Sequence, residues 1–375
     1  MTTANPLHRL TDLGQSVWLD YIERGFIQSG ELARVIRDDR ISGLTSNPAI
    51  FHKALVGGGY DEVVKALARE GRSPEAIWSV LVVEDIRSAA DALAGVYANT
   101  RGRDGYVSLE VSPLLARHAQ RTIADARRLA SLVQRPNLML KVPGTTEGVD
   151  AISRLTAEGF NINVTLLFSP DRYDAIADAY MQGLEQRVAA GEPIERIASV
   201  ASFFVSRIDT LVDERLASRR EASALRGLAA IALAKLAYDH YRSLRSSARW
   251  RALESRGARL QRVLWASTGT KNPAYSDVKY VDALIAPGTI ATLPVETLIA
   301  YRDHGDPAVR LNGVVDGGGP DPEYVLQRLA QVGIDAASVA AQLEEEGVRK
   351  FVEPFEATLA VLRERVRKLQ GQPDA

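Results

Sequence analysis

The chain has 375 residues, with 46 lysine or arginine and 47 aspartate or glutamate residues, so its formal net charge is −1. This balance gives no electrostatic footprint for nucleic acid or an anionic membrane, and we expect neither as a partner. The absence of cysteine excludes disulfides, catalytic thiolates and cysteine-ligated metal sites. No apolar signal segment begins the sequence and no apolar run is long enough to span a membrane, which predicts a cytoplasmic location.

Short apolar runs alternate with amphipathic stretches along most of the chain. Strand–helix alternation of this length is typical of parallel βαβ units. Because no glycine-rich dinucleotide turn is present, the pattern favours a closed (β/α)8 TIM-type barrel over an open doubly wound sheet. The candidate strands are Val17–Ile22, Gly43–Pro48, Tyr106–Ser112, Asn137–Pro143, Asn161–Ser169, Ala198–Ser206, Arg262–Thr268 and Val281–Pro287.

Helical patterns lie between these strands, for example at Pro113–Val133 and Pro170–Ala190. A serine directly before a proline is typical of a helix start, because the serine caps the helix and proline suits its first position. This device predicts helix starts at Ser73, Ser112 and Ser169.

Additional helices are expected around the barrel, within a single barrel domain that spans residues 1–375 and whose barrel covers about 13–290. Residues 221–253 are rich in Ala, Leu and Arg and exceed the length of one crossover helix, which predicts a helical insertion. Residues 294–370 are mostly helical in pattern and are expected to cover part of the barrel. The pattern is broken at Val314–Pro320, where three consecutive glycines predict a loop.

Polar and apolar side chains alternate along the candidate strands, so each set shares one face. The outer face of a barrel strand packs on helices, and the polar set should therefore point into the barrel near the strand C-terminal ends, where barrel active sites lie. Burying such groups costs on the order of several kcal/mol unless they pair, and the alternative to a functional site is a satisfied polar core network. Consistent parity on five strands favours a functional site. The inward set comprises Asp20, Asn47, Glu110, Lys141, Asn163 and Thr165, whereas Ile162, Val164 and Leu166 are expected to face outward.

Lys141 is the central candidate for catalysis. Desolvation disfavours the ammonium form of a buried lysine, so a barrel lysine can supply a neutral amine. Such an amine attacks a ketone to give a carbinolamine and then an imine, which is an electron sink for cleavage of a β-hydroxyketone. Asp20 and Glu110 can serve as the two acid/base groups, and Thr165 can help to hold a water. The alternative is a structural ion pair between Lys141 and one of these carboxylates.

The ends of the sixth and seventh strands predict a phosphate site, a common location in barrels. The run Ser199–Arg207 ends the sixth strand with a serine and an arginine, and the run Trp265–Asn272 ends the seventh with hydroxyls, a glycine and Lys271. Arginine suits bidentate phosphate contact and lysine supplies a point charge. The alternative for Arg207 is a surface salt bridge at a helix start.

The five histidines, at positions 8, 52, 118, 240 and 304, are scattered, so no metal site is expected. A pyridoxal enzyme, which also uses a lysine Schiff base, stays an alternative, although the sequence shows no clear acidic or arginine partner for the pyridine nitrogen.

The segments that carry these residues resemble, in order, the signature strands of the transaldolase family. They read VWLDYIERGFI, GLTSNPAIF, VSLEVSP, NLMLKVPGT, NINVTLLFS and VASFFVSRID. The most specific are Thr45–Phe51 and Leu140–Thr145. The resemblance covers about residues 13–287, and the insertion at 221–253 is similar to that of the longer bacterial branch.

The resemblance implies that Lys141 is the Schiff-base lysine and that Asp20 acts on the substrate hydroxyl during carbon–carbon cleavage. Glu110 and Thr165 would position the water that shuttles protons at the imine step. Arg207 would bind phosphate within the family's SxFxxR pattern. The implied substrate-binding set is Thr45, Asn47, Asn163, Ser202, Phe204, Arg207, Ser267 and Lys271, in which the two asparagines hold hydroxyls of the three-carbon unit.

The implied reaction belongs to the pentose phosphate pathway and needs no cofactor. It passes dihydroxyacetone from sedoheptulose 7-phosphate to glyceraldehyde 3-phosphate, giving erythrose 4-phosphate and fructose 6-phosphate. One segment departs from the family: the smaller branch has a compact ASFRN, whereas residues 266–272 are two residues longer and place Lys271 where the arginine falls.

Two other functions stay open at this point. A Schiff-base aldolase would use the same residues but release dihydroxyacetone to water, and the extended helices favour transfer because they predict a covered site. A non-catalytic sugar-phosphate-binding barrel is the other, although such a protein has no need of a buried amine nucleophile.

Overall fold

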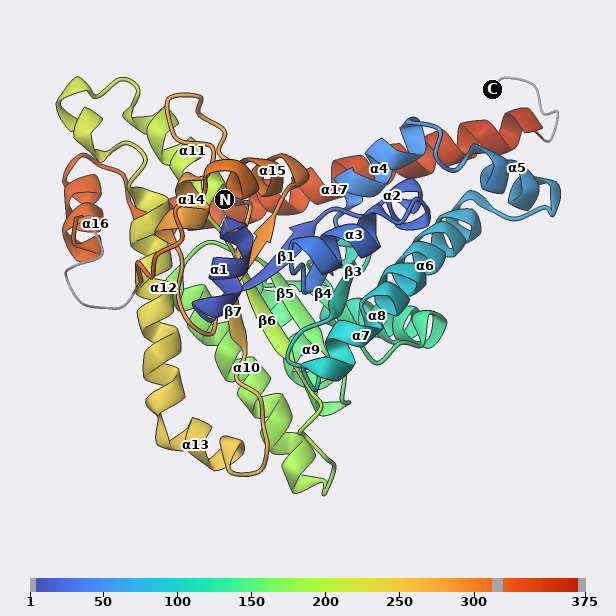
Figure 1. Cartoon of the computed structure of the whole chain (residues 1–375), viewed down its shortest axis with the longest axis horizontal. Helices are drawn as coiled ribbons and strands as arrows, with labels where there is room; N and C mark the ends of the chain where they lie inside the picture. The colour runs from blue at the N-terminus through green and yellow to red at the C-terminus, as the bar shows by residue number, and fades with distance from the viewer. Residues whose placement is uncertain (1–4, 312–319, 370–375) are drawn as a thin grey trace.

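The computed structural model describes residues 5–311 and 320–369. Its strands form a closed parallel barrel in which each strand pairs with the next along the chain and β8 pairs with β1, which confirms the expected (β/α)8 fold (Figure 1). The strands are β1 (Ser16–Asp20), β2 (Gly43–Thr45), β3 (Tyr106–Glu110), β4 (Leu138–Pro143), β5 (Ile162–Leu167), β6 (Ser199–Phe204), β7 (Arg262–Ala266) and β8 (Ile290–Leu293).

Helices surround the barrel (Figure 1). In the first half they are α1 (Pro6–Asp12), α2 (Arg24–Gln28), α3 (Glu31–Asp38), α4 (Pro48–Val56), α5 (Asp61–Arg69), α6 (Pro74–Ala92), α7 (Ala94–Asn99), α8 (Ala119–Val133) and α9 (Thr146–Ala157). In the second half they are α10 (Pro170–Ala189), α11 (Ser206–Leu216), α12 (Ala229–Ser246), α13 (Ala248–Glu254), α14 (Lys279–Ala283), α15 (Val295–His304), α16 (Pro322–Gln331) and α17 (Ala336–Leu369). Among the described residues, none of these helices is long and apolar enough to cross a membrane.

Two of the three predicted serine caps are present. Ser73 and Ser169 each accept a hydrogen bond from the backbone N–H three residues further on, at the starts of α6 and α10. Ser112 makes no such bond, and a short 3-10 turn, η1 (Pro113–Leu115), follows it. Because α8 begins only at Ala119, the prediction of one continuous helix in this segment was wrong.

The eighth strand lies further along the chain than predicted. Val281–Pro287 contains the end of α14 and a loop, and β8 begins at Ile290, after a turn in which Gly288 has a φ of 82°. Both segments are short apolar runs, and periodicity alone does not distinguish a strand from a helix in runs of this length. The prediction of Val281–Pro287 as a strand was therefore wrong.

The fifth strand departs from simple alternation near its end. Leu166 has a φ of 64°, and the pairing of β5 with β6 shifts between Val164 and Leu167. The Leu166 side chain meets α17, because a Cβ atom on Gly347 would lie 2.9 Å from its Cδ2. The prediction that Leu166 faces the outer helices was wrong, since a bulge reorients the side chain.

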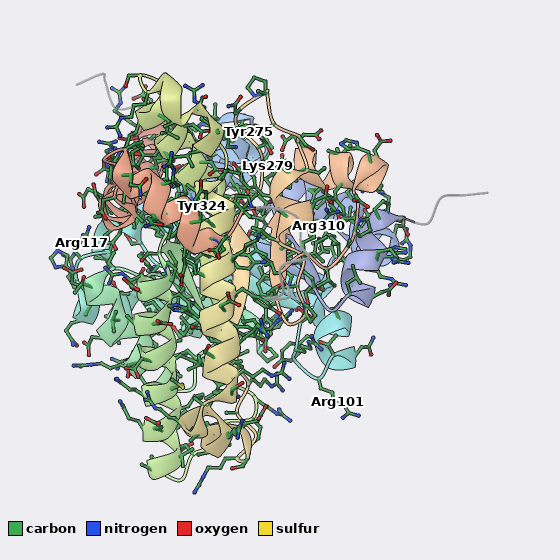
Figure 2. All side chains as sticks on the ribbon, turned by 90° about the vertical axis from the view of Figure 1, so that its left-hand side faces the viewer. Arg101, Arg117, Tyr275, Lys279, Arg310 and Tyr324 are labelled. Carbon is green, nitrogen blue, oxygen red and sulfur yellow. The ribbon has the colours of Figure 1, made fainter. Side chains whose placement is uncertain are left out.

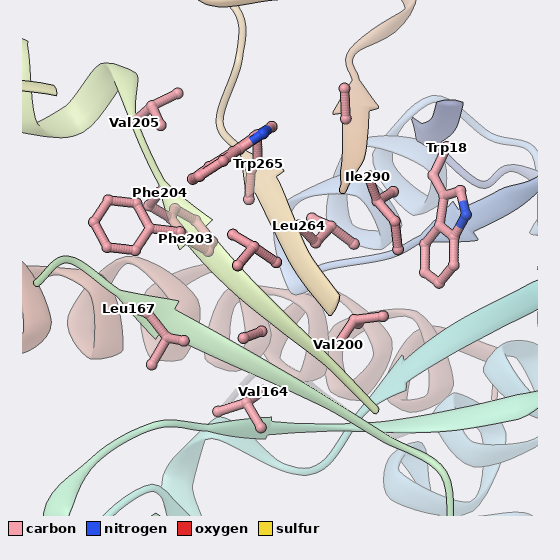
Figure 3. Packing of buried hydrophobic residues seen from close by; sticks show 14 of the residues in the cluster. Trp18, Val164, Leu167, Val200, Phe203, Phe204, Val205, Leu264, Trp265 and Ile290 are labelled. Atoms are coloured by element: carbon pink, nitrogen blue, oxygen red, sulfur yellow. The ribbon is translucent and has the colours of Figure 1, made fainter. Parts of the chain in front are cut away.

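The core includes outward-facing residues of β5, β6 and β7, some of which are seen from close by in Figure 3. Val164, Phe203 and Trp265 are completely buried there, and the rings of the last two meet edge to face with centroids 6.1 Å apart.

A polar network closes the N-terminal end of the barrel. Trp18 Nε1 and Ser16 Oγ donate hydrogen bonds to Asp104 over 3.1 and 2.8 Å, and Arg262 forms an ion pair with the same carboxylate at 3.0 Å. Gly43 faces the indole so closely that a Cβ atom would lie 2.4 Å from Trp18 Cδ2. This end is therefore filled by side chains, and space for a ligand is left at the opposite mouth.

The predicted insertion at 221–253 contains α12 and α13, which are separated where Ser247 caps α13. Helix α12 lies beside α10 and α16 (Figure 2). The long helix α17 contacts α4, α5, α6, α11 and β5, so the expected cover over part of the barrel is present. The loop predicted at Val314–Pro320 lies outside the described residues except for Pro320.

We expect Gly43→Ala to lower the free energy of unfolding by about 1–3 kcal/mol, because the added methyl group overlaps the Trp18 indole. Urea unfolding measures the change. Gly95→Ala is the matched control, since a Cβ atom there meets nothing within 4 Å and the position lies in α7. That control should gain about 0.5–1 kcal/mol from helix propensity. Equal stability changes in the two variants would contradict the tight contact.

Candidate active site

A cavity of about 200 Å³ lies at the C-terminal ends of the strands, where parity places the inward polar residues. Nine of the twelve predicted site residues line it: Asp20, Thr45, Asn47, Lys141, Ser202, Phe204, Arg207, Ser267 and Lys271. The other three are Glu110, Asn163 and Thr165, which strand pairing places around Lys141.

The register of neighbouring strands brings the catalytic candidates together. Glu110 on β3 pairs with Lys141 on β4, and Lys141 pairs with Asn163 on β5. Thr165 pairs with Pro143, two residues further along β4. Because residues of equal register and parity point to the same side of a sheet, these side chains form adjacent layers inside the barrel.

Lys141 is 4% exposed and has one short polar contact, in which Nζ donates to the carbonyl oxygen of Ser46 over 2.8 Å. Glu110 Oε2 lies 3.7 Å from Nζ, beyond ordinary hydrogen-bond length. The alternative of an ion pair with Glu110 is therefore present only in a loose form. Among the described side chains no ion pair joins Lys141 to Asp20.

Burial raises the pKa of Glu110 from 4.5 to about 7, and the negative charge of Asp20 acts in the same direction. The nearby Lys141 opposes this shift but does not cancel it. Neither carboxylate oxygen accepts a hydrogen bond from a described residue, and the buried hydroxyl of Thr165 also has no described partner. Buried polar atoms of proteins are rarely left in this state, and a catalytic role is one of the explanations for such an exception.

Two threonine side chains on neighbouring strands hold the Asp20 carboxylate in place at the end of β1. Thr45 Oγ1 donates to Asp20 Oδ1 over 2.8 Å, and it lies 3.0 Å from Thr292 Oγ1. Thr292 also lines the cavity and was missed by the sequence prediction, because β8 was placed at the wrong segment. The orientation of Asp20 thus depends on strands from both ends of the barrel sequence.

The two asparagines differ in how much of their hydrogen-bonding capacity is already used. Asn47 caps α4 through Oδ1, which accepts from a backbone N–H over 3.1 Å, so its amide N–H groups stay available to the cavity. Asn163 donates to Ser108 over 2.9 Å and accepts from Ser202 over 2.7 Å. The satisfied polar network considered as the alternative is present at Asn163.

Arg207 lies in the first turn of α11 with its Nη1 buried and without a described hydrogen-bond partner. Burial lowers the pKa of its guanidinium, whose carbon stands 5.1 Å from the centre of the Phe204 ring. The surface salt bridge considered as the alternative is not formed within the described chain. Ser267 Oγ lies 2.8 Å from Ser206 Oγ, and the exposed Lys271 stands on the same loop. These positive charges are suited to a phosphate group.

Phe351 of α17 also lines the cavity, although it lies far along the chain from the barrel strands. The sequence prediction missed it, because one apolar residue in an amphipathic helix carries no sign of what it will contact. Within residues 5–311 and 320–369, no group of three or more His, Asp or Glu side chains is placed to hold a metal ion.

A closed parallel barrel with a buried lysine among polar groups at the strand C-terminal ends is the architecture of a (β/α)8-barrel enzyme. Residues 17–362 match the family model described as Transaldolase/Fructose-6-phosphate aldolase. A transaldolase of Saccharopolyspora erythraea is 49% identical over 367 residues, which cover 98% of this chain and 99% of that protein. A transaldolase of Thermobifida fusca is 50% identical over 359 residues, covering 95% and 96%. The chain belongs to the transaldolase family.

We expect Glu110→Gln to change the pH dependence of thermal stability. A carboxyl group whose pKa is raised from 4.5 to about 7 contributes stability that is fully present below the unfolded value and is lost as the pH rises through the folded value. The melting temperature of the variant minus that of the wild type should therefore increase between pH 5 and pH 8, by about 2 °C or more.

Differential scanning calorimetry across this pH range provides the measurement. Glu62→Gln is the control, because a hydrogen bond and the charge of Lys65 lower the pKa of Glu62, which stays ionised throughout the range. Its difference from the wild type should be constant. A constant difference for Glu110→Gln as well would contradict the raised pKa.

Proposed function

We propose that the chain transfers a dihydroxyacetone unit from sedoheptulose 7-phosphate to glyceraldehyde 3-phosphate through a Schiff base on Lys141, a reaction of the pentose phosphate pathway. Membership in the transaldolase family supports a transferase acting on sugar phosphates. The observation that carries the proposal is the position of the Lys141 amine, buried 3.7 Å from Glu110 and facing a cavity that is also lined by Arg207, which forms no ion pair with a described residue.

Substrate binding begins with the phosphate group. Arg207 supplies a buried cation whose Nη1 has no hydrogen-bond partner among the described residues, and Ser267 and Lys271 supply further donors from the loop after β7. A phosphate held there leaves the carbon chain to extend across the cavity towards Lys141. The free amide N–H groups of Asn47 are in place to hold hydroxyls near the ketone.

Imine formation requires a group that gives and takes protons near neutral pH. Lys141 Nζ attacks the ketone carbon, and the resulting carbinolamine loses its oxygen as water once that oxygen is protonated. Glu110, with a pKa of about 7, is matched to this exchange, and the free hydroxyl of Thr165 can hold the water that carries the proton.

Carbon–carbon cleavage requires a base at the other side of the cavity. Asp20 accepts the proton of the β-hydroxyl, that oxygen forms the carbonyl of the leaving aldose phosphate, and the bonding electron pair moves into the iminium to give an enamine on Lys141. The enamine carbon then attacks the aldehyde of the acceptor. Reversal of the first steps releases fructose 6-phosphate.

We expect Lys141→Ala to abolish turnover and adduct formation while the protein stays folded. Borohydride reduction with fructose 6-phosphate, followed by peptide mass mapping, should place the wild-type adduct on Lys141. Lys271→Ala, which truncates the other lysine of the cavity, is the control and should keep the adduct. Turnover retained by Lys141→Ala, or an adduct on another residue, would contradict the assignment of Lys141 as the Schiff-base lysine.

Turnover with and without an aldose phosphate acceptor distinguishes the alternatives. Transfer depends on the acceptor, an aldolase releases dihydroxyacetone without one, and a binding protein shows neither activity.

Asp20→Asn should still trap an adduct with borohydride but cleave the sugar about 10²–10⁴-fold more slowly, because the base for the β-hydroxyl is lost. Single-turnover release of erythrose 4-phosphate from sedoheptulose 7-phosphate measures cleavage, and the trapped fraction measures imine formation. Loss of trapping with cleavage retained would reverse the roles given to Asp20 and Glu110.

A further inference from the structure

Phe351 brings α17 into contact with the reactive groups of the barrel. Its side chain is 5% exposed, and its ring centre lies 5.5 Å from Lys141 Nζ and 6.0 Å from the guanidinium carbon of Arg207. The ring lines the cavity that also contains Asp20. One apolar ring therefore stands beside both the amine nucleophile and the buried cation.

Contacts along one face of α17 hold this ring in place. Glu344, Gly347 and Phe351 are spaced three and four residues apart, so they share a helix face. Glu344 forms ion pairs with Arg117 at 2.9 Å and Arg172 at 3.2 Å, which come from the segments after β3 and β5. Gly347 allows α17 to approach β5 closely, because a Cβ atom at this position would lie only 2.9 Å from Cδ2 of Leu166 in the β5 bulge. The helix is thus fixed against β5 and against the segments that follow β3 and β5.

An enamine on Lys141 has two possible fates. In transfer, its carbon forms a bond to the acceptor aldehyde. In release, the carbon takes a proton instead, water adds to the iminium carbon, and the carbon–nitrogen bond breaks, so the water oxygen becomes the ketone oxygen and the amine leaves with a proton. Both routes end with hydrolysis of an iminium, but only release begins with protonation of the enamine carbon, so access of water as a proton source to that carbon decides the partition between them.

We propose that Phe351 is a positioning residue that keeps solvent water from the enamine carbon of the Lys141 adduct and so sets the partition between transfer and release. This inference rests on the proposed function. The ring offers no hydrogen bond to a water beside Nζ, and its face is suited to the positive charge of the iminium. The specificity for a sugar acceptor over water thus depends on α17 as well as on the barrel.

The partition is measured as the rate of dihydroxyacetone release from fructose 6-phosphate without acceptor, divided by the rate of transfer to glyceraldehyde 3-phosphate. Phe351→Ala should raise this ratio about tenfold, because water gains access to the adduct. Phe355→Ala is the matched control. Phe355 lies one turn further along α17, where its ring meets Trp78 edge to face with centroids 6.0 Å apart. It does not line the cavity around Lys141 but a neighbouring one, which also contains Glu110. Loss of the Phe355 ring should leave the ratio unchanged.

Two further variants keep the test independent of folding. Phe351→Leu stays apolar and should keep a ratio close to that of the wild type, whereas Phe351→Gln has a comparable length but can hold a water and should raise the ratio. If the ring had a purely structural role, these variants would change the rates of release and of transfer by the same factor, and their ratio would stay constant.

The outcomes separate this inference from the proposed function. Normal transfer with an unchanged ratio in both Phe351→Ala and Phe351→Gln overturns the inference alone. An equal rise in Phe355→Ala also overturns it, since general loosening of α17 would then be the cause. A wild-type protein without transfer and without a borohydride adduct on Lys141 overturns the proposed function itself, and this inference with it.

Discussion

The register of β3, β4 and β5 is the constraint on which the site depends. It places Glu110, Lys141 and Asn163 side by side, and a slip of one residue would turn the lysine out into the helical layer. Barrel closure prevents such a slip, because every strand is paired on both sides. The network of Trp18 and Asp104 fills the N-terminal end of the barrel interior, so the polar layer at the C-terminal end packs on a solid core.

Burial then determines the chemistry of this layer. Water is largely excluded from Lys141, and the carboxylate beside it stands too far away for an ordinary hydrogen bond. A tightly paired lysine and glutamate would both be fixed in their charged forms. Burial, which the loosely placed Lys141 opposes without cancelling, instead raises the pKa of Glu110 to about 7, where a small change in its surroundings moves a proton. The same arrangement that costs stability therefore supplies an acid/base group suited to neutral pH.

Sequence reasoning predicted the parts of the site that follow from local rules. The period of two along a strand correctly separated inward from outward residues around Lys141, and Ser-Pro pairs marked two helix starts. It failed where tertiary contacts decide the outcome. The short run at Ile290–Leu293 was passed over, so Thr292 was missed, and the positive φ that reorients Leu166 has no marker in a leucine. Phe351 lines the cavity only because α17 crosses the barrel.

The site consists of groups at the strand ends and a cover formed by α17, and different interactions hold these two parts in place. The reactive groups stand at consecutive strand ends, so a shift in one of them is resisted by backbone pairing on both sides. The cover depends on a distant helix held by ion pairs of Glu344 and by the close approach at Gly347, contacts that can weaken without disturbing the barrel. In the proposed reaction, bond cleavage and the exclusion of water therefore rest on separable parts of the fold. A chain could keep the first and lose the second, and the chemistry expected of such a chain is release in place of transfer.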